Sequence, residues 1–383
     1  KEKKNFFLNK FLIFYFFSTL SILLIFLVFI FTSSLFNKKV NIFLDHFSKA
    51  GRFEYLYIFN MGFNALKSNF YHLEKLDLEI NFKEILKVEN FRKTAIKNKS
   101  LGNSENIPIV KGNLILNSKK YEAELRLKGE RLIHFKKKNK SSYRVKLKKN
   151  NFILGINKFS LQKPRVRNYI HEWLFHEMAG EEGLIKLKYE FLDFYINGSS
   201  QGLYVLEEAF GKELIERNKR RNGPIFAFDD NMVNFSTEFK VDEDNPFFEI
   251  YNKKYWSLPE NIELVNVASQ KLRDFINGER KIENTFDLDL FAKFFAIIDA
   301  TYTYHATSPG TLRLYYNPIN GLFEPIPFDG QREHPNYRKY NSSFNEDILI
   351  DKDKVWWVKK FFFHKDKINY SFYNKYIKSL KRI

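Results

Sequence analysis

The segment YEFLDFYINGSSQGLYVLEE, residues 189–208, gives the clearest indication of the fold. It predicts two strands, YEFLDFYIN and GLYVLEE, joined by a polar turn over residues 197–202. Asn and Gly readily adopt the backbone conformations that tight turns require, so the pattern predicts an antiparallel β-hairpin. The second strand ends at Glu207 and Glu208, which places two carboxylates at the end of the hairpin.

Four shorter runs upstream also alternate between apolar and polar residues. They are IVKGNLILN, YEAELRLKG, SYRVKLKK and KFSLQ, all within residues 109–162. A period of two is typical of strands with one buried face. Helical spacing then prevails at residues 167–182, 211–221 and 288–304, followed by a hairpin over residues 312–329. The sequence therefore predicts an α+β fold, in which an antiparallel sheet precedes a mostly helical second lobe.

An apolar segment near the N-terminus, FLIFYFFSTLSILLIFLVFIFT, covers residues 11–32 without a charge, Pro or Gly. As a helix it would extend about 33 Å, which matches the hydrocarbon core of a bilayer. Basic residues are more frequent before the segment than after it: Lys1, Lys3, Lys4 and Lys10 against Lys38 and Lys39. This asymmetry favours a cytoplasmic N-terminus and an extracytoplasmic domain. We expect an uncleaved, single-pass membrane anchor, with a cleaved signal peptide as the alternative.

The predicted organisation has five parts. A cytoplasmic tail over residues 1–10 precedes the transmembrane helix, and a helical juxtamembrane region follows over residues 33–108. The α+β domain then covers residues 109–350, and a C-terminal segment covers 351–383 without a clear stop pattern.

The net charge of +18 reflects 63 basic and 45 acidic residues. A nucleic-acid partner is one interpretation of such a charge. However, 47 of the basic residues are Lys and 16 are Arg, and Asn, Ile and Phe are also abundant. This composition favours codon bias combined with a local anion site, so a nucleic-acid partner is not expected. The sequence contains no Cys, which excludes disulfides, thiol nucleophiles and Cys-ligated zinc.

Three segments carry residues suited to phosphate chemistry. Residues 131–149 contain nine Lys or Arg and no acid, and strand alternation places Arg144 and Lys146 on one face. Such a row of cations could hold phosphates, or it could be a solvated strand face. Glu207 or Glu208 could pair with a strand lysine, or both could be surface acids. Asp329, which precedes Gly330 after an apolar strand, could ligate Mg²⁺ or belong to an ordinary turn.

Taken together, these segments resemble the CotH kinase family, which is the spore-coat protein H type of atypical kinases. The resemblance extends from residue 121 to residue 330. It is carried by the motifs RLKGE, SYRVKL and GINKFSL, the Arg-containing helix predicted at residues 167–182, and the motifs NGSSQGLYVLEE and LYYNPINGLFEPIPFD, in that order. It implies an atypical protein-kinase-like domain that binds ATP with Mg²⁺ and phosphorylates proteins.

The resemblance also implies roles for individual residues. Lys146 or Lys140 would contact the phosphates of ATP, Glu207 or Glu208 would be the conserved acid after the hairpin, and Asp329 would ligate the metal. The family pattern W-D-x-D reads F-D-G-Q here, so Gln331 replaces the second acid.

The position where the family has a catalytic Asp lies here in TYTYHATSPGT. His305 in this segment could act as the base, or it could be structural. Asp299 is a second candidate, although it falls within an apolar helical pattern. Three functions remain open from the sequence: a protein kinase that modifies Ser or Thr of an envelope or surface protein, an inactive pseudokinase or structural envelope protein, and a basic module that binds anionic polymers.

Overall fold

The computed structural model describes most of the chain beyond residue 72. The described residues are Tyr15, 18–23, 73–102, 104–129, 131–137, 140–228, 248–308, 310–330, 356–364 and 367–383. The chain forms two compact units, Lys1–His72 and Leu73–Ile383. All of the architecture that follows belongs to the second unit.

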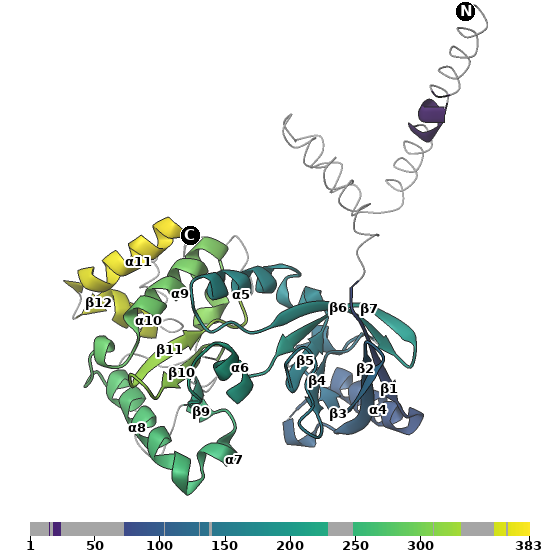
Figure 1. Ribbon diagram of the computed structural model, residues 1–383, viewed down its shortest axis with the longest axis horizontal. Helices are drawn as coiled ribbons and strands as arrows, with labels where there is room; N and C mark the ends of the chain where they lie inside the picture. Colours follow the sequence, from purple (N-terminus) through teal and green to yellow (C-terminus); the bar gives the residue numbers. More distant parts are fainter. Residues whose placement is uncertain are drawn as a thin grey trace, which may run out of the picture. The chain divides into compact units, whose positions relative to one another are not determined.

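The first half of this unit is a closed barrel of seven strands, in the order β1-β2-β3-β4-β5-β7-β6 (Figure 1). The strands are β1 (Lys75–Ile80), β2 (Val110–Leu116), β3 (Lys119–Leu127), β4 (Tyr143–Leu147), β5 (Lys158–Gln162), β6 (Tyr189–Ile196) and β7 (Ser199–Glu208). One core cluster fills the barrel with alternate side chains from every strand, such as Leu78, Leu114, Leu125, Phe159 and Tyr204. Helix α4 (Phe82–Lys97) connects β1 to β2.

The β6–β7 hairpin confirms the prediction for residues 189–208, but its turn is shorter than expected. Ile196 pairs with Ser199, so the turn consists of Asn197 and Gly198 alone. Their φ angles are +48° and +75°, as a two-residue turn of this kind requires. The Asn197 side chain also bonds to both backbone groups of Ile80, which ties the turn to β1.

Closure of the barrel corrects the predicted fold class. Residues 75–78 of β1 pair in parallel with residues 193–196 of β6, and this contact joins the two edges of the sheet. The prediction of an antiparallel N-lobe sheet is therefore corrected to a closed barrel with one parallel pairing. The segment that closes the barrel comes from the region predicted to be a helical link, more than 100 residues from its partner strand.

The second half of the unit contains helices and a sheet, so the prediction of a mostly helical lobe is also corrected. Its sheet has the order β11-β10-β8-β9. The strands are β8 (Ile225–Phe228), β9 (Phe248–Ile250), β10 (Arg313–Asn317) and β11 (Leu322–Ile326), and a small hairpin pairs β12 (Phe363–His364) with β13 (Lys367–Ile368). The helices are α5 (His171–Glu181), α6 (Lys212–Arg217), α7 (Lys253–Trp256), α8 (Pro259–Ile276), α9 (Leu288–Thr301), α10 (Trp356–Phe362) and α11 (Tyr370–Arg382).

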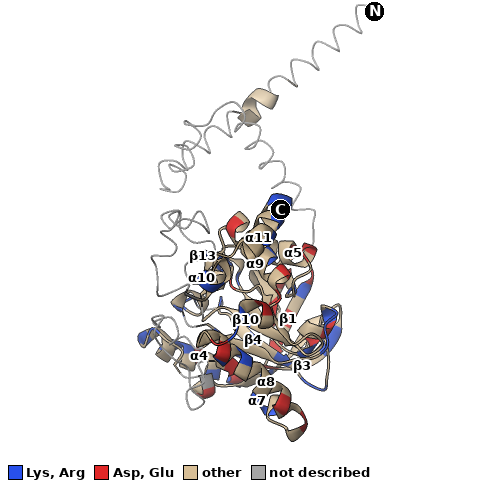
Figure 2. Ribbon diagram, turned by 90° about the vertical axis from the view of Figure 1, so that its left-hand side faces the viewer, with Lys and Arg blue, Asp and Glu red and all other residues tan. Residues whose placement is uncertain are grey.

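Aromatic packing around α9 forms the core of this half. Phe291 is fully buried and stacks on Phe361 of α10, with 4.7 Å between ring centroids. Phe286 and Phe295 contact the same two rings. Helix α11 packs along α9, and its last turn carries Lys381 and Arg382 near the C-terminus of the chain (Figure 2). Basic residues at that end interact favourably with the helix dipole.

The predicted transmembrane helix is not carried forward. Of residues 11–32, only Tyr15 and residues 18–23 are described, and the rest of that prediction lies outside the described residues. Within the described part of the chain, no helix is both long enough and apolar enough to cross a membrane. The predicted single-pass membrane location is corrected accordingly, because no described helix supports it. The domain boundaries proposed from the sequence stay predictions.

Replacing Phe291 with Ala should lower the free energy of unfolding by about 3–5 kcal/mol, because it leaves a cavity among aromatic rings that cannot close. Chemical denaturation monitored by circular dichroism measures this change. Phe82→Ala is the matched control, since the Phe82 side chain is 71% exposed at the start of α4. The control should change the free energy by less than about 0.5 kcal/mol. Equal losses in both variants would contradict the assignment of this core.

Candidate active site

A cavity of about 1380 Å³ lies between the outer wall of the barrel and the second half of the unit. The barrel contributes residues from β3, β4, β5 and the end of β7. The second half contributes the end of α9, the short helix η6 (Tyr304–Thr307), the start of β10 and the segment after β11. The cavity therefore brings together segments that are far apart in the sequence.

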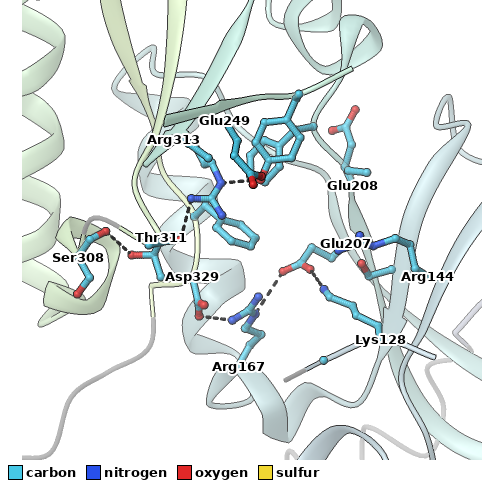
Figure 3. A pocket seen from close by; sticks show the side chains of 18 of the residues that line it. Lys128, Arg144, Arg167, Glu207, Glu208, Glu249, Ser308, Thr311, Arg313 and Asp329 are labelled. Carbon is cyan, nitrogen blue, oxygen red and sulfur yellow. Dashed lines mark hydrogen bonds and ion pairs between the residues drawn. The ribbon is translucent and has the colours of Figure 1, made fainter. Parts of the chain in front are cut away.

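Lys128 and Glu207 form a buried ion pair on the barrel side of this cavity (Figure 3). The Lys128 Nζ atom lies 2.6 Å from Glu207 Oε2 and also donates to Gln162 Oε1 at 3.2 Å. Burial alone would raise the pKa of Glu207, but Lys128 and Arg167 outweigh it and hold that pKa at about 2. Burial also lowers the pKa of Lys128, although Glu207 opposes this change. Glu207 is thus a fixed negative charge held by two cations.

Arg167 extends this network across the cavity. It comes from the short helix η3 (Pro164–Arg167), and its Nε atom lies 3.4 Å from Glu207 Oε1. Its Nη1 atom pairs with Asp329 Oδ1, and its guanidinium lies over the Phe328 ring at 5.1 Å. Burial would lower the pKa of Arg167, but the surrounding carboxylates of Glu207, Asp329 and Glu172 raise it. Arg167 therefore joins the barrel wall to the segment after β11.

Asp329 lies in a tightly constrained turn. Its φ angle is +55°, which is uncommon for a residue with a side chain and is tolerated best by Asn and Asp. Gly330 packs so closely on α5 that a Cβ atom there would lie 2.4 Å from Phe175 Cδ1. The Gly330 carbonyl also bonds to His171 Nδ1 at 3.1 Å. These contacts direct the Asp329 carboxylate towards Arg167 and towards His305, whose Nε2 atom lies 3.7 Å from Asp329 Oδ2.

The structure brings several of the sequence-predicted residues to this cavity. Arg144 and Lys146 line it from β4, where Arg144 faces Arg126 on β3, and Lys146 faces Lys158 on β5 and Glu124 on β3. Like charges directly opposite each other destabilise a sheet. The cavity therefore has a cationic wall that a bound anion would stabilise.

Three other predicted residues lie differently. Lys140 is exposed and is not among the residues that line the cavity. Glu208 points away from Glu207 in Figure 3 and pairs with Arg217 instead. Burial raises the pKa of Glu208, and its Oε2 atom also accepts a bond from the Lys188 backbone at 2.9 Å. These contacts are those of a structural residue.

Asp299 lines the cavity but is held by two tyrosines. The Tyr376 hydroxyl of α11 donates to Asp299 Oδ2, and Tyr304 makes a second side-chain hydrogen bond to the same carboxylate. His305 also lines the cavity and, of these two candidates for the base, is the one beside Asp329.

Lys128 and Arg167 were not selected from the sequence, although both lie in segments that carried the resemblance. Lys128 is the lysine of RLKGE and follows the last residue of β3. The signal that could have identified it is the following Gly129, whose φ angle is +108°. A Cβ atom at Gly129 would lie 2.1 Å from the His134 ring, so the backbone there must be a glycine. Burial, Lys128 and Arg167 lower the pKa of His134 to about 4, which keeps this part of the wall neutral.

The donor set fits a magnesium ion shared with phosphates better than a site made by protein alone. Among the described residues, no group of three or more His, Asp or Glu converges on one point. Asp329 offers a single carboxylate at the cavity. Mg²⁺ is commonly held by one or two carboxylates together with substrate phosphates and water. Asp329 would be the protein ligand of such an ion.

Comparison with known proteins identifies the family of the chain. The family model for CotH kinase proteins matches residues 125–381, so the chain belongs to the CotH kinase family, and the resemblance predicted from the sequence is confirmed. The chain is 25% identical over 237 residues to the inner spore coat protein H of Bacillus subtilis strain 168. That match covers 60% of this chain and 63% of the relative, which is less than two thirds of its length.

A solved structure gives a weaker similarity. The proinflammatory kinase CtkA of Helicobacter pylori is 11% identical, with a TM-score of 0.27, over 63% of this chain and 77% of that protein. A similarity of this size is too low to support conclusions about the fold.

Replacing Glu207 with Gln should lower the free energy of unfolding at pH 7 by roughly 3 kcal/mol, because two buried cations lose their counter-charge. The folded-state pKa is about 2 against an ordinary value of 4.5. The stabilisation is therefore present above pH 4.5 and is lost as the pH falls towards 2. Denaturation at several pH values should show that the difference between wild type and Glu207→Gln shrinks over this interval. Glu122→Gln, at an exposed pair with Lys149, is the control and should change stability little at any pH.

Gly330→Ala should destabilise the protein by about 1–3 kcal/mol, because the added methyl group overlaps the Phe175 ring. Thermal unfolding measures the loss. Gly180→Ala, within helix α5, is the control. Its added Cβ would lie 2.6 Å from Cδ of Lys186, a flexible side chain that can shift, so the loss of stability should be smaller. A stable Gly330→Ala variant would show that the turn does not need its close approach to α5.

Proposed function

We propose that this CotH-family chain binds ATP with Mg²⁺ and transfers the γ-phosphoryl group to a Ser or Thr hydroxyl of a protein. One observation carries the proposal: the buried Lys128–Glu207 pair and Asp329 face the same cavity and are joined through Arg167. Phosphoryl transfer depends mainly on positioning and on neutralising the charge of the phosphates. A fixed lysine, a metal-binding aspartate and additional arginines are suited to that task.

Several cations of the cavity would contact the phosphates of ATP. Lys128 is held in one place by Glu207, so it can contact a phosphate without losing side-chain freedom at the moment of binding. Arg144 and Lys146 offer two further positive charges on the exposed part of β4. No acid lies opposite Arg144 in the sheet, whereas Lys146 faces Glu124 on β3 and would contact phosphate oxygens beside that carboxylate.

Asp329 and His305 would act at the transferred group. Mg²⁺, when bound to Asp329 and the phosphates, supplies charge neutralisation for the oxygens of the transferred group. A new bond forms between the acceptor oxygen and the γ-phosphorus as the bond from that phosphorus to the β–γ bridging oxygen breaks. The acceptor proton passes to His305, which lies beside Asp329 in the same cavity. The contacts of Asp299 with Tyr304 and Tyr376 support a structural role for that residue.

A second candidate function is nucleotide binding without phosphoryl transfer, which is favoured by the change in the acidic motif. Gln331 stands where the family has a second acid, and Asp329 is paired with Arg167. A relic of a kinase would retain the lysine and the cavity and lack turnover. The two candidates make different predictions for the same variants.

ATP with Mg²⁺ should raise the melting temperature of the full chain, and Lys128→Met should abolish this rise. Asp329→Asn should remove the part that depends on Mg²⁺ and reduce phosphoryl transfer from radiolabelled ATP at least about 100-fold. Asp289→Asn is the matched control, because Asp289 pairs with Lys375 on an exposed surface. It should leave both measurements unchanged.

Absence of any nucleotide-dependent shift in the wild type would refute the proposal. A shift without transfer under any condition would instead support the inactive alternative.

A further inference from the structure

Lys140 belongs to a second group of cations outside the cavity. This basic cluster consists of Lys137, Lys140, Lys163 and Arg165, and three of the four are exposed while Lys163 is half-buried. Burial lowers the pKa of Lys163, and the three other cations lower it further. The two segments that carry these cations lie side by side, because β4 and β5 pair antiparallel with Tyr143 opposite Leu161.

No acidic residue of the described chain compensates this cluster. None of its members forms an ion pair with a described Asp or Glu, and no carboxylate affects the pKa of Lys163. The cluster lies on two segments, the one before β4 and the one after β5. Grouped cations without counter-charges raise the local concentration of anions and steer charged ligands towards them. The cluster is therefore a candidate docking point for a negatively charged partner.

Two exposed apolar residues follow the basic cluster in the sequence. Tyr169 and Ile170 are 62% and 61% exposed, at the start of helix α5. Asn168 and Tyr169 both have positive φ angles, +54° and +63°. This conformation is strained for a bulky residue and persists only where the surroundings fix it. Here the Tyr169 N–H donates to the Pro164 carbonyl at 2.8 Å, which holds the Tyr169 backbone to the segment that carries Arg165.

The apolar group borders the proposed reaction centre. The next residue, His171, bonds through Nδ1 to the Gly330 carbonyl at 3.1 Å and through Nε2 to the Thr301 carbonyl at 2.9 Å. Gly330 directly follows Asp329, and Thr301 precedes Tyr302, which is itself 43% exposed. The segment 163–171 thus leads from the basic cluster, through the exposed Tyr169 and Ile170, to His171, which contacts the turn that holds Asp329.

We infer that this surface docks the acceptor protein through an acidic segment that contacts the basic cluster. An apolar side chain of the acceptor packs against Tyr169 and Ile170, and it lies in the acceptor sequence between the acidic residues and the phosphorylated hydroxyl. The inference rests on the proposed function and specifies its substrate class. The cations supply the complementary charge, the apolar pair supplies contact area, and the surface ends where the hydroxyl would have to lie. The cationic wall of the cavity, formed by Arg144 and Lys146, is a separate set of residues, so docking and nucleotide binding can be tested independently.

The test measures binding of three fluorescent probes to the full chain by anisotropy. The probes are a Ser-containing peptide with Asp and Glu on one side of a Leu, the same peptide with Lys in place of the acids, and a single-stranded oligonucleotide of similar charge to the first. We expect the acidic peptide to bind at least 10-fold more tightly than the other two. The double variant Lys163→Glu with Arg165→Glu should lose that preference and favour the basic peptide.

Tyr169→Ala should weaken the acidic peptide several-fold and spare the thermal shift with ATP and Mg²⁺. The matched control is Lys378→Glu with Lys381→Glu, which makes the same change of charge on the exposed face of α11. This control should bind like the wild type. Circular dichroism verifies that each variant is folded.

Equal binding of the acidic and basic peptides, with the nucleotide shift intact, would overturn this inference and leave the proposed function standing. Oligonucleotide binding as tight as that of the acidic peptide, lost in the same double variant, would overturn it in favour of a nucleic-acid surface. Absence of a nucleotide-dependent shift of the melting temperature in the wild type would refute the proposed function, whichever peptide binds.

Discussion

The carboxylate of Glu207 is the charge on which the site depends. It is 1% exposed, and a carboxylate in that position is stable only with close counter-charges. Lys128 and Arg167 supply them from two different segments of the barrel side. Because Arg167 also pairs with Asp329, the interaction that stabilises Glu207 also fixes the barrel wall relative to the segment after β11. Stability and the geometry of the cavity therefore have a common origin.

The closed barrel makes this arrangement rigid. Strand β7 lies between β5 and β6, so both sides of the strand that carries Glu207 are hydrogen-bonded. Ser160 and Tyr189 flank Glu207 directly in the ladder. An open sheet would leave an edge exposed, whereas closure through β1 and β6 leaves none. The barrel holds the lysine and the glutamate in one orientation, and the second half of the unit presents the aspartate to them.

Local patterns in the sequence were sufficient for the hairpin and for the family, but not for the architecture. Alternation in residues 189–208 and the Asn197–Gly198 pair define β6 and β7 from short-range chemistry alone. Barrel closure depends on a parallel contact between residues 75–78 and 193–196, which no local pattern encodes. The predicted membrane helix rested on length and hydropathy only. Most of its residues lie outside the described part of the chain, and no described helix meets both criteria.

The candidate site shows the same division. Glu207 lies near the end of a predicted strand and Asp329 follows another, so their positions near strand ends were accessible from sequence. Which lysine pairs with Glu207 was not, because Lys146 lies within one predicted strand and Lys128 directly follows another. Only the register of β3, β4 and β5 distinguishes Lys146, which is exposed opposite Lys158, from Lys128, which lies at the buried end.

The pairing of Arg167 with Asp329 bears on how a metal would enter this site. A metal ion held by Asp329 would compete with the buried Arg167 guanidinium, which would keep only its longer contact to Glu207. Phosphate oxygens would offer Arg167 a replacement, since Arg binds them with the same geometry as a carboxylate. Among the described residues, no other group of acids could hold the ion beforehand. On the proposed function, Asp329 would hold the metal ion and Arg167 would hold phosphate oxygens, so we expect metal and nucleotide to bind together.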